Sequence, residues 1–138
     1  MSGTDFRAHV LLIEDEDNVR EIVTYLLEAL GFSVTACASG QDGVGAYREE
    51  WQSIDLIMLD LLMPVMDGEE TFRQLKAINP DLVVLISSGF GLEDKAQKLL
   101  DEGARGFIQK PYRKDPLFEM IKKLLPHVVD SPAQECAV

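Results

Sequence analysis

Short runs of apolar residues alternate along this chain with longer segments in which apolar residues recur every three or four positions. The apolar runs predict five β-strands, at residues 10–13, 32–38, 54–59, 82–87 and 106–108. The segments between and after them have helical spacing and predict five helices, at residues 19–30, 39–50, 68–78, 92–102 and 116–125. Strands that alternate with helices through short loops form a parallel sheet with helices on both faces. The pattern therefore predicts a doubly wound α/β protein.

Several residues at the ends of these segments support the predicted boundaries. Ser39 is a predicted N-cap, because its hydroxyl can accept a hydrogen bond from a free amide in the first helical turn. Gly31 and Gly103 follow the first and fourth helices, where glycine commonly ends a helix. For the fifth helix we expect Asp115 to be the N-cap and Pro116 the first helical residue.

The length and composition of the chain indicate one domain. The chain has 138 residues, of which 46% are apolar and 27% charged, as in ordinary globular proteins. We expect a disordered leader at residues 1–7, the domain at 8–127 and a flexible tail at 128–138. The apolar runs are far shorter than the roughly 20 residues that span a bilayer, and no export signal opens the chain. With two cysteines that form no disulfide framework, these features favour a cytoplasmic location.

The chain carries a strong negative charge, because 24 acidic residues face 13 basic ones and give a net charge of −11. Such a charge repels nucleic acids and anionic membranes, so we expect no direct contact with either. It leaves open a basic protein partner or a divalent cation. Most of the acidic residues belong to an ordinary solvated surface, and the informative ones are those at the ends of strands.

In doubly wound sheets, ligands bind beyond the carboxyl ends of the strands. The polar residues that follow the predicted strands are Glu14, Asp15, Asp60, Ser87, Ser88 and Lys110. Carboxylate oxygens suit Mg²⁺, which shares its coordination with phosphate oxygens, whereas no His or Cys is available near these loops for zinc. A lysine and a hydroxyl at the same edge suit a phosphoryl group. The sequence thus predicts a site for magnesium and phosphate.

The same residues carry a resemblance to a known family. The stretches VLLIEDE at residues 10–16 and DLLMPVMDG at residues 60–68, together with Ser88-Gly89 and Lys110-Pro111, resemble the response-regulator receiver domain of bacterial two-component signalling. The resemblance covers about residues 8–126, and the second stretch is the most specific part of it. It implies a flavodoxin-like, doubly wound (βα)5 fold with a five-stranded parallel sheet in the order 2-1-3-4-5.

The resemblance also implies a role for each residue of the acidic group. Asp60 is the expected phosphoacceptor, whose carboxylate attacks a phosphoryl group and becomes an acyl phosphate. Asp15 and Asp60 are expected to bind Mg²⁺ (or Mn²⁺), Glu14 to assist through water, and the backbone carbonyl of Leu62 to complete the metal site. Glu14 departs from the family pattern, which more often has Asp at this position. We expect the change to be tolerated because this residue acts on the metal at longer range, through water.

Other family positions concern the phosphoryl group and the response to it. Ser88 is expected to hydrogen-bond the phosphoryl oxygens and Lys110 to pair with their charge. Ser87 stays open as an alternative to Ser88, because consecutive strand residues point to opposite faces and only one can line the site. Phe107 matches an aromatic switch position that moves inward with the hydroxyl. The resemblance further implies a cis peptide bond between Lys110 and Pro111.

Two apolar residues, Leu62 and Phe90, stand two positions beyond Asp60 and Ser88. Both positions flank the expected route of the water that hydrolyses the acyl phosphate. Neither side chain can orient a water molecule, and Phe90 is large enough to exclude one. Because orientation of the attacking water is a sizeable part of phosphoryl-transfer catalysis, we expect slow loss of the phosphoryl group.

These observations favour a phosphorylation switch that receives its phosphoryl group from a sensor histidine kinase or a phosphotransfer protein, not a turnover enzyme. Such a domain stands alone or belongs to a hybrid kinase, and it can form a homodimer through the face of the fourth helix, fifth strand and fifth helix.

Two alternatives to a phosphorylation switch remain. An aspartyl-phosphate phosphatase of the haloacid-dehalogenase type needs a second acid where Leu62 stands. A nucleotide- or flavin-binding domain needs a glycine-rich loop where residues 14–16 are acidic.

Overall fold

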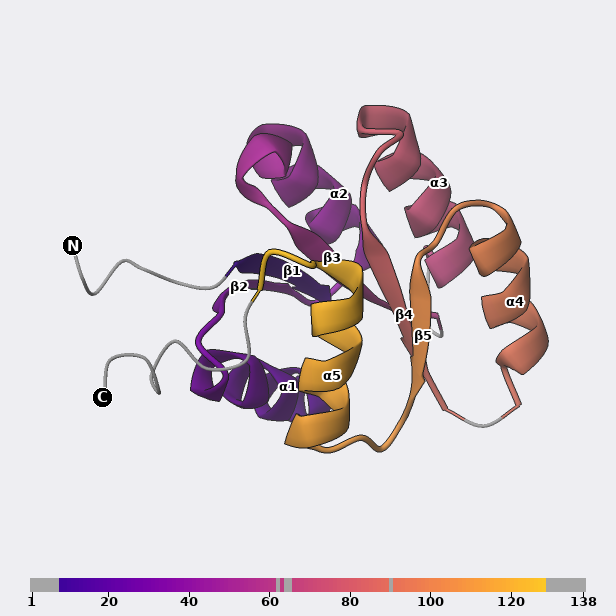
Figure 1. Cartoon of the computed structure of the whole chain (residues 1–138). Helices are drawn as coiled ribbons and strands as arrows, with labels where there is room; N and C mark the ends of the chain where they lie inside the picture. Colours follow the sequence, from indigo (N-terminus) through magenta and orange to yellow (C-terminus); the bar gives the residue numbers. More distant parts are fainter. Residues whose placement is uncertain (1–7, 62, 64–65, 90, 129–138) are drawn as a thin grey trace, which may run out of the picture.

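The computed structural model describes residues 8–61, 63, 66–89 and 91–128 (Figure 1). Its five strands form one parallel sheet in the order β2-β1-β3-β4-β5, which confirms the predicted fold class. The strands are β1 (His9–Ile13), β2 (Ser33–Cys37), β3 (Leu56–Asp60), β4 (Val84–Ser88) and β5 (Gly106–Gln109). The helices are α1 (Asp17–Ala29), α2 (Gly40–Glu50), η2 (Trp51–Ser53), α3 (Gly68–Ile78), α4 (Glu93–Asp101) and α5 (Lys114–Leu124). None of the described helices has the length and apolar character needed to cross a bilayer.

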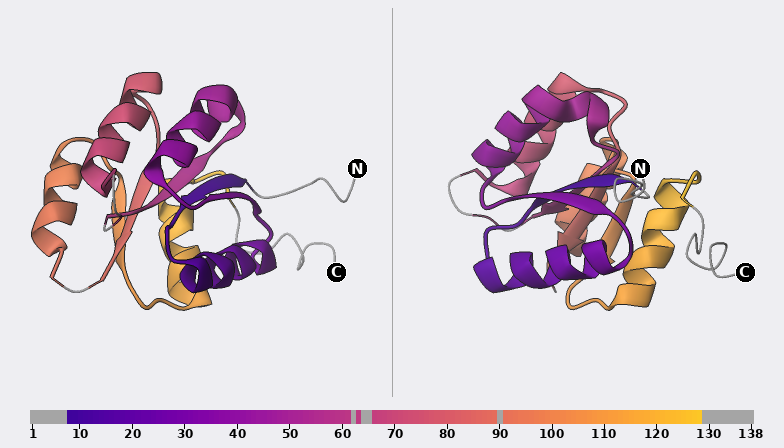
Figure 2. Two further views of the ribbon diagram at one scale, coloured as in Figure 1. Left: turned by 180° about the vertical axis from the view of Figure 1, so that it is seen from behind. Right: turned by 90° about the vertical axis from the view of Figure 1, so that its left-hand side faces the viewer.

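The sheet lies between two layers of helices (Figures 1 and 2). Residues Leu11 and Ile13 of β1 face a core built with α2, α3 and α4, whereas Val10 and Leu12 face a second core built with α1 and α5. All four side chains are buried because both faces of the strand are covered. This double burial explains why the central strands read as continuous apolar runs and not as alternating patterns.

The predicted helix ends are partly confirmed. The hydroxyl of Ser39 accepts a hydrogen bond from the Asp42 amide at 3.0 Å, as expected of an N-cap. The prediction for α5 is wrong, since the helix begins at Lys114 and Arg113 is the N-cap residue, without a side-chain capping bond. Pro116 is therefore the third helical residue. All amides of the first turn lack intrahelical partners, so proline is tolerated at any of these positions and does not mark the first one.

The strand order places the functional loops at one edge. Because β1 lies between β2 and β3, the chain leaves the carboxyl ends of β1 and β3 in opposite directions, toward helices on different faces. This arrangement opens a crevice at the switch point, where ligands bind in doubly wound folds. The loops after β4 and β5 end at the same edge, because all five strands are parallel.

The turn that leads from β3 into α3 depends on Asp67 and Gly68. The Asp67 carboxylate caps α3 by accepting a hydrogen bond from the Glu70 amide at 3.0 Å. The Gly68 amide donates to the Leu61 carbonyl at 3.1 Å, so the start of α3 lies directly against the end of β3. A Cβ atom on Gly68 would lie 2.6 Å from the Leu61 Cα atom, which is closer than packed atoms can approach.

We predict that Gly68→Ala destabilises the protein by about 1–3 kcal/mol, although alanine is the better helix former, because the backbone of β3 must move. Gly45→Ala is the matched control, since Gly45 lies inside α2 and a Cβ there would meet nothing within 4 Å. The free energy of unfolding of Gly45→Ala should rise by about 0.5–1 kcal/mol. Urea unfolding of both proteins measures the difference, and equal effects at the two positions would contradict the packing argument.

Candidate functional site

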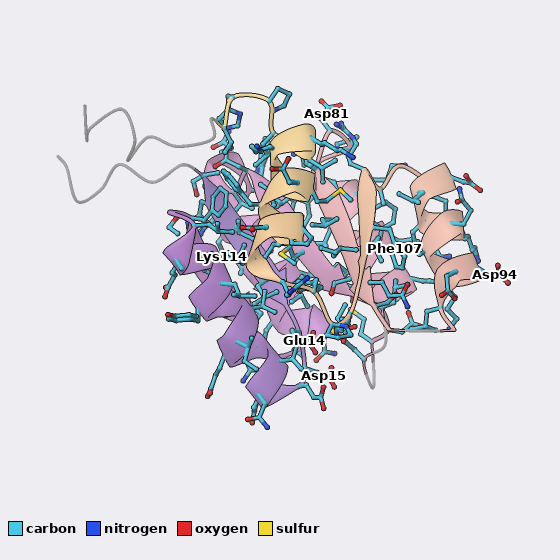
Figure 3. The ribbon with its side chains drawn as sticks, turned by 60° about the horizontal axis from the view of Figure 1, so that its bottom comes forward. Glu14, Asp15, Asp81, Asp94, Phe107 and Lys114 are labelled. Atoms are coloured by element: carbon cyan, nitrogen blue, oxygen red, sulfur yellow. The ribbon has the colours of Figure 1, made fainter. Side chains whose placement is uncertain are left out.

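Three carboxylates meet at the carboxyl edge of the sheet. One oxygen from each of Glu14, Asp15 and Asp60 lies within 4.8 Å of the other two. The register explains why Glu14 and Asp60 are close, because Ile13 pairs with Leu59 and each is followed directly by one of these acids. Asp15 is the next residue after Glu14. Glu14 and Asp60 are buried, with 2% and 4% of their surface exposed. Figure 3 shows Glu14 and Asp15 together at this edge, with Asp81 at the opposite one.

The Lys110 ammonium group connects two of these acids. Its Nζ atom lies 2.8 Å from Glu14 Oε1 and 3.3 Å from Asp60 Oδ1. Burial lowers the pKa of Lys110, but the hydrogen bond that Lys110 donates to Glu14 and the charges of both acids outweigh it, so the pKa is raised above the ordinary lysine value. Lys110 is therefore charged at neutral pH. The peptide bond between Lys110 and Pro111 is cis, as predicted.

Glu14 and the start of α1 are fixed by contacts that the sequence pattern did not predict. The Arg20 guanidinium donates to the Glu14 carbonyl at 3.0 Å and also contacts the Asp17 carboxylate at 2.6 Å. The Glu16 amide donates to Glu14 Oε2 at 3.2 Å. Arg20 belongs to the polar side of the α1 pattern, so only the return of the helix over its preceding loop places it here. Arg20 thus fixes the backbone of Glu14, and the Glu16 amide fixes its side chain.

The two serines at the end of β4 have different environments. The Ser87 hydroxyl lies 3.5 Å from the hydroxyl of Tyr112 and points to the face covered by α1 and α5. Ser88 is fully buried, and its Oγ atom has no hydrogen-bond partner in the described part of the chain. A free hydroxyl at this edge suits an incoming ligand better than one that already contacts a tyrosine. The geometry therefore favours Ser88, as expected, without showing a contact to Asp60.

Phe107 is partly buried and packs against the core beneath α2, α3 and α4 (Figure 3). Its predicted switch movement stays a prediction.

Some of the predicted residues and segments lie outside the described residues. They are Leu62, which is expected to provide a metal-binding carbonyl, Phe90, the leader at 1–7 and most of the tail. Val128, placed at the start of the tail, is buried against the core near Leu125, so packing extends at least to this residue.

The acidic group has the chemistry of a magnesium site. All three side chains offer carboxylate oxygens, and a hollow of about 120 Å³ adjoins Asp15, bounded by the loops after β2 and β3. Mg²⁺ is usually held by one or two carboxylates and keeps several waters, so it needs such space beside its ligands. The residues present thus fit a hydrated magnesium ion.

Comparison with known proteins identifies the family. The family model for the response regulator receiver domain matches residues 10–122, which include all the strands but the first residue of β1 and every acid of the site. The chain belongs to the response regulator receiver domain family. It is therefore a receiver domain of two-component signalling, as the strand-end residues suggested, and this membership disfavours the phosphatase and flavin-binding alternatives.

Three relatives illustrate the match. The receiver domain is 33% identical to sensor kinase CckA of Brucella abortus over 86% of this chain and 12% of the relative. It resembles the crystal structure of a response regulator receiver domain protein from Clostridium thermocellum, with TM-score 0.83 and 31% identity over 86% of this chain and 94% of that one. A chain in the crystal structure of the CheX-CheY-BeF3-Mg²⁺ complex from Borrelia burgdorferi has TM-score 0.81 and 25% identity, over 89% of this chain and 92% of that one. The chain spans only 12–28% of the length of the first curated relatives it matches.

We predict that Lys110→Met destabilises the metal-free protein by about 3 kcal/mol, because it leaves Glu14 and Asp60 buried without their cation. Lys98→Met is the control, because the Nζ atom of Lys98 is 3.8 Å from Glu69 Oε2 and the Lys98 side chain is 53% exposed. The free energy of unfolding of this variant should differ from that of the wild type by no more than about 0.5 kcal/mol. Chemical unfolding in the presence of a chelator measures both. A Lys110 variant as stable as the control would show that the buried acids do not depend on the lysine.

Proposed function

We propose that this receiver domain accepts a phosphoryl group on Asp60 from a phosphohistidine of a sensor histidine kinase or phosphotransfer protein. The observation that carries the proposal is the position of the Asp60 carboxylate, which lies at the sheet edge between two other acids and the Lys110 ammonium group. In the transfer, an Asp60 oxygen forms a bond to phosphorus as the bond between phosphorus and the histidine nitrogen breaks. The electron pair of that bond stays on the imidazole.

The main obstacle to this reaction is charge, because an anionic phosphoryl group must approach an anionic carboxylate. The Lys110 ammonium group offsets part of the repulsion. Asp15, Asp60 and Glu14 would hold Mg²⁺ (or Mn²⁺), directly or through water, and the bound ion would neutralise charge on the phosphoryl oxygens. The crystal structure of the Borrelia relative, a CheX-CheY-BeF3-Mg²⁺ complex, supports the proposal by similarity.

Phosphorylation is proposed to act as a switch. The Ser88 hydroxyl donates a hydrogen bond to the phosphoryl group, Phe107 moves inward, and the surface of α4, β5 and α5 changes its binding to partners or to a second copy of the chain. The domain catalyses its own phosphorylation and slow dephosphorylation, with Leu62 and Phe90 limiting water, and is not a turnover enzyme by itself. It acts in the cytoplasm and, given its charge, without direct contact to nucleic acid or membrane.

We predict that acetyl phosphate with Mg²⁺ adds one phosphoryl group to the wild-type protein and none to Asp60→Asn. Without a divalent cation the adduct should fall to background, since Lys110 alone leaves the acidic pocket negative. Intact-mass measurement reports the adduct, and circular dichroism checks that the variant is folded. Glu69→Gln, at an acid on α3 that pairs with Lys98, is the charge-matched control and should be modified like the wild type. An adduct that survives in Asp60→Asn would exclude Asp60 as the acceptor.

A surface for the phosphoryl donor lies next to the pocket. A hollow of about 160 Å³ is lined by apolar residues of α1 and by residues 110–112, so Lys110 borders both this surface and the site. Ile22 of α1, which lines this hollow, is 59% exposed, and exposed apolar groups that adjoin a hollow often mark an interface. We propose that the helix carrying the phosphohistidine packs here, which brings its imidazole toward Asp60.

We predict that Ile22→Ser slows transfer from a kinase or phosphotransfer domain that phosphorylates the wild type by about tenfold, equivalent to about 1.4 kcal/mol. Transfer from acetyl phosphate, which needs no protein surface, should change much less. Trp51→Ser in η2 removes another exposed apolar side chain and serves as the control. Equal slowing of both donors by Ile22→Ser, or equal slowing by the two variants, would count against this docking surface.

A further inference from the structure

Two buried polar atoms at the ends of neighbouring strands have no hydrogen-bond partner within the described part of the chain. Among the described residues, the buried side-chain atoms without a hydrogen bond are Ser88 Oγ and Gln109 Nε2. The two residues are direct partners in the parallel register of β4 and β5. Buried polar groups are nearly always hydrogen-bonded. Two unsatisfied atoms on residues that are partners in adjacent strands are therefore unusual.

The two side chains extend from the same face of the sheet. One register pair involves Ile86 and Phe107, which both pack in the core beneath α2, α3 and α4. Side chains alternate along a strand, so Ser88 and Gln109, two residues further on, return to this face. Adjacent strands lie about 4.8 Å apart, which is within reach of a glutamine side chain. A change of rotamer can therefore bring the amide and the hydroxyl into contact.

Their hydrogen-bonding capacities are complementary. The amide nitrogen of Gln109 only donates, whereas the hydroxyl of Ser88 donates one proton and accepts two hydrogen bonds. When Nε2 donates to Oγ, both atoms are satisfied and the hydroxyl proton is still free. That proton then points away from Gln109 and can be donated to an anion. Linked hydrogen bonds of this kind also strengthen each other.

We infer that Gln109 is a positioning residue for Ser88, whose amide donates to the Ser88 hydroxyl and directs its proton toward the phosphoryl group on Asp60. This inference rests on the proposed function, because it requires a phosphoryl group at Asp60. In the unphosphorylated protein this bond is not formed, and neither atom has another partner among the residues that the structure describes. Arrival of the phosphoryl group turns the hydroxyl toward the pocket, and Gln109 follows it. Gln109 thereby stabilises the phosphorylated arrangement without touching the phosphoryl group.

The test compares four proteins: wild type, Gln109→Met, Ser88→Ala and the double variant. Methionine keeps the length and approximate volume of glutamine but cannot donate. The measurements are the initial rate of phosphorylation by acetyl phosphate with Mg²⁺ and the urea midpoint of the unphosphorylated protein. We expect Gln109→Met to lower the rate about fivefold to tenfold in the presence of Ser88 and to have no effect in its absence. The unfolding midpoint should stay the same or rise, because an unsatisfied buried amide is removed.

Further variants sharpen the result. Ser88→Thr keeps the hydroxyl, so the effect of Gln109→Met should persist in that background. Gln109→Glu keeps the shape but accepts the Ser88 proton, and should lower the rate at least as much as Gln109→Met. An unchanged rate in Gln109→Met, an equal effect with and without Ser88, or a lower unfolding midpoint would each overturn the inference. If wild type itself gains no phosphoryl group, the proposed function fails and this inference with it, whereas a modified wild type leaves the proposed function standing.

Discussion

The contact of the Lys110 ammonium group with Glu14 and Asp60 is the interaction on which the rest of the site depends. It joins the ends of β1, β3 and β5, and it must pass over β4, which lies between β3 and β5. The end of β4 carries the small side chains of Ser87 and Ser88, and Gly89 follows the strand. The ion pair therefore links the carboxyl ends of three strands across a strand end that has only small side chains.

This ion pair leaves the site unbalanced in charge. Glu14, Asp15 and Asp60 bring three carboxylates within 4.8 Å of one another, and Lys110 contacts two of them. Removing charged groups from water costs free energy that one lysine offsets only in part. A protein selected for stability alone would not keep such a group. The remaining negative charge favours a divalent cation, while the ammonium group favours a phosphoryl oxygen, so the cost to stability and the capacity to bind share the same residues.

The sequence predicted the site well because its residues follow directly from the topology. Because the strands are parallel, the residues at the ends of β1, β3, β4 and β5 must share one edge of the sheet. Asp60 and Lys110 could therefore be placed at the same edge from the sequence pattern alone. The contact of Arg20 could not be predicted, since it depends on where α1 returns over the loop before it. The contact of Tyr112 could not be predicted either, since it depends on the path of the loop between β5 and α5. The start of α5 was missed because proline is tolerated throughout a first helical turn. The pairing of Ser88 with Gln109 required the register, which apolar runs define only to within a residue or two.

In the proposed function, the two faces of the sheet have different roles, one in the phosphoryl chemistry and the other in the response to it. Asp60 and Ser87 follow Met58 and Leu85, which face α1 and α5, while Ser88, Gln109 and Phe107 belong to the face of α2, α3 and α4. A phosphoryl group on Asp60 extends beyond the sheet edge, where side chains of both faces can reach it. Ser88 is the residue of β4 that connects this edge with the second face. Because β5 lies at the border of the sheet, Gln109 and Phe107 can move with Ser88 without breaking a strand pair on their outer side. In the proposed switch, the edge position of β5 therefore serves both its response to the site and its contact with partners.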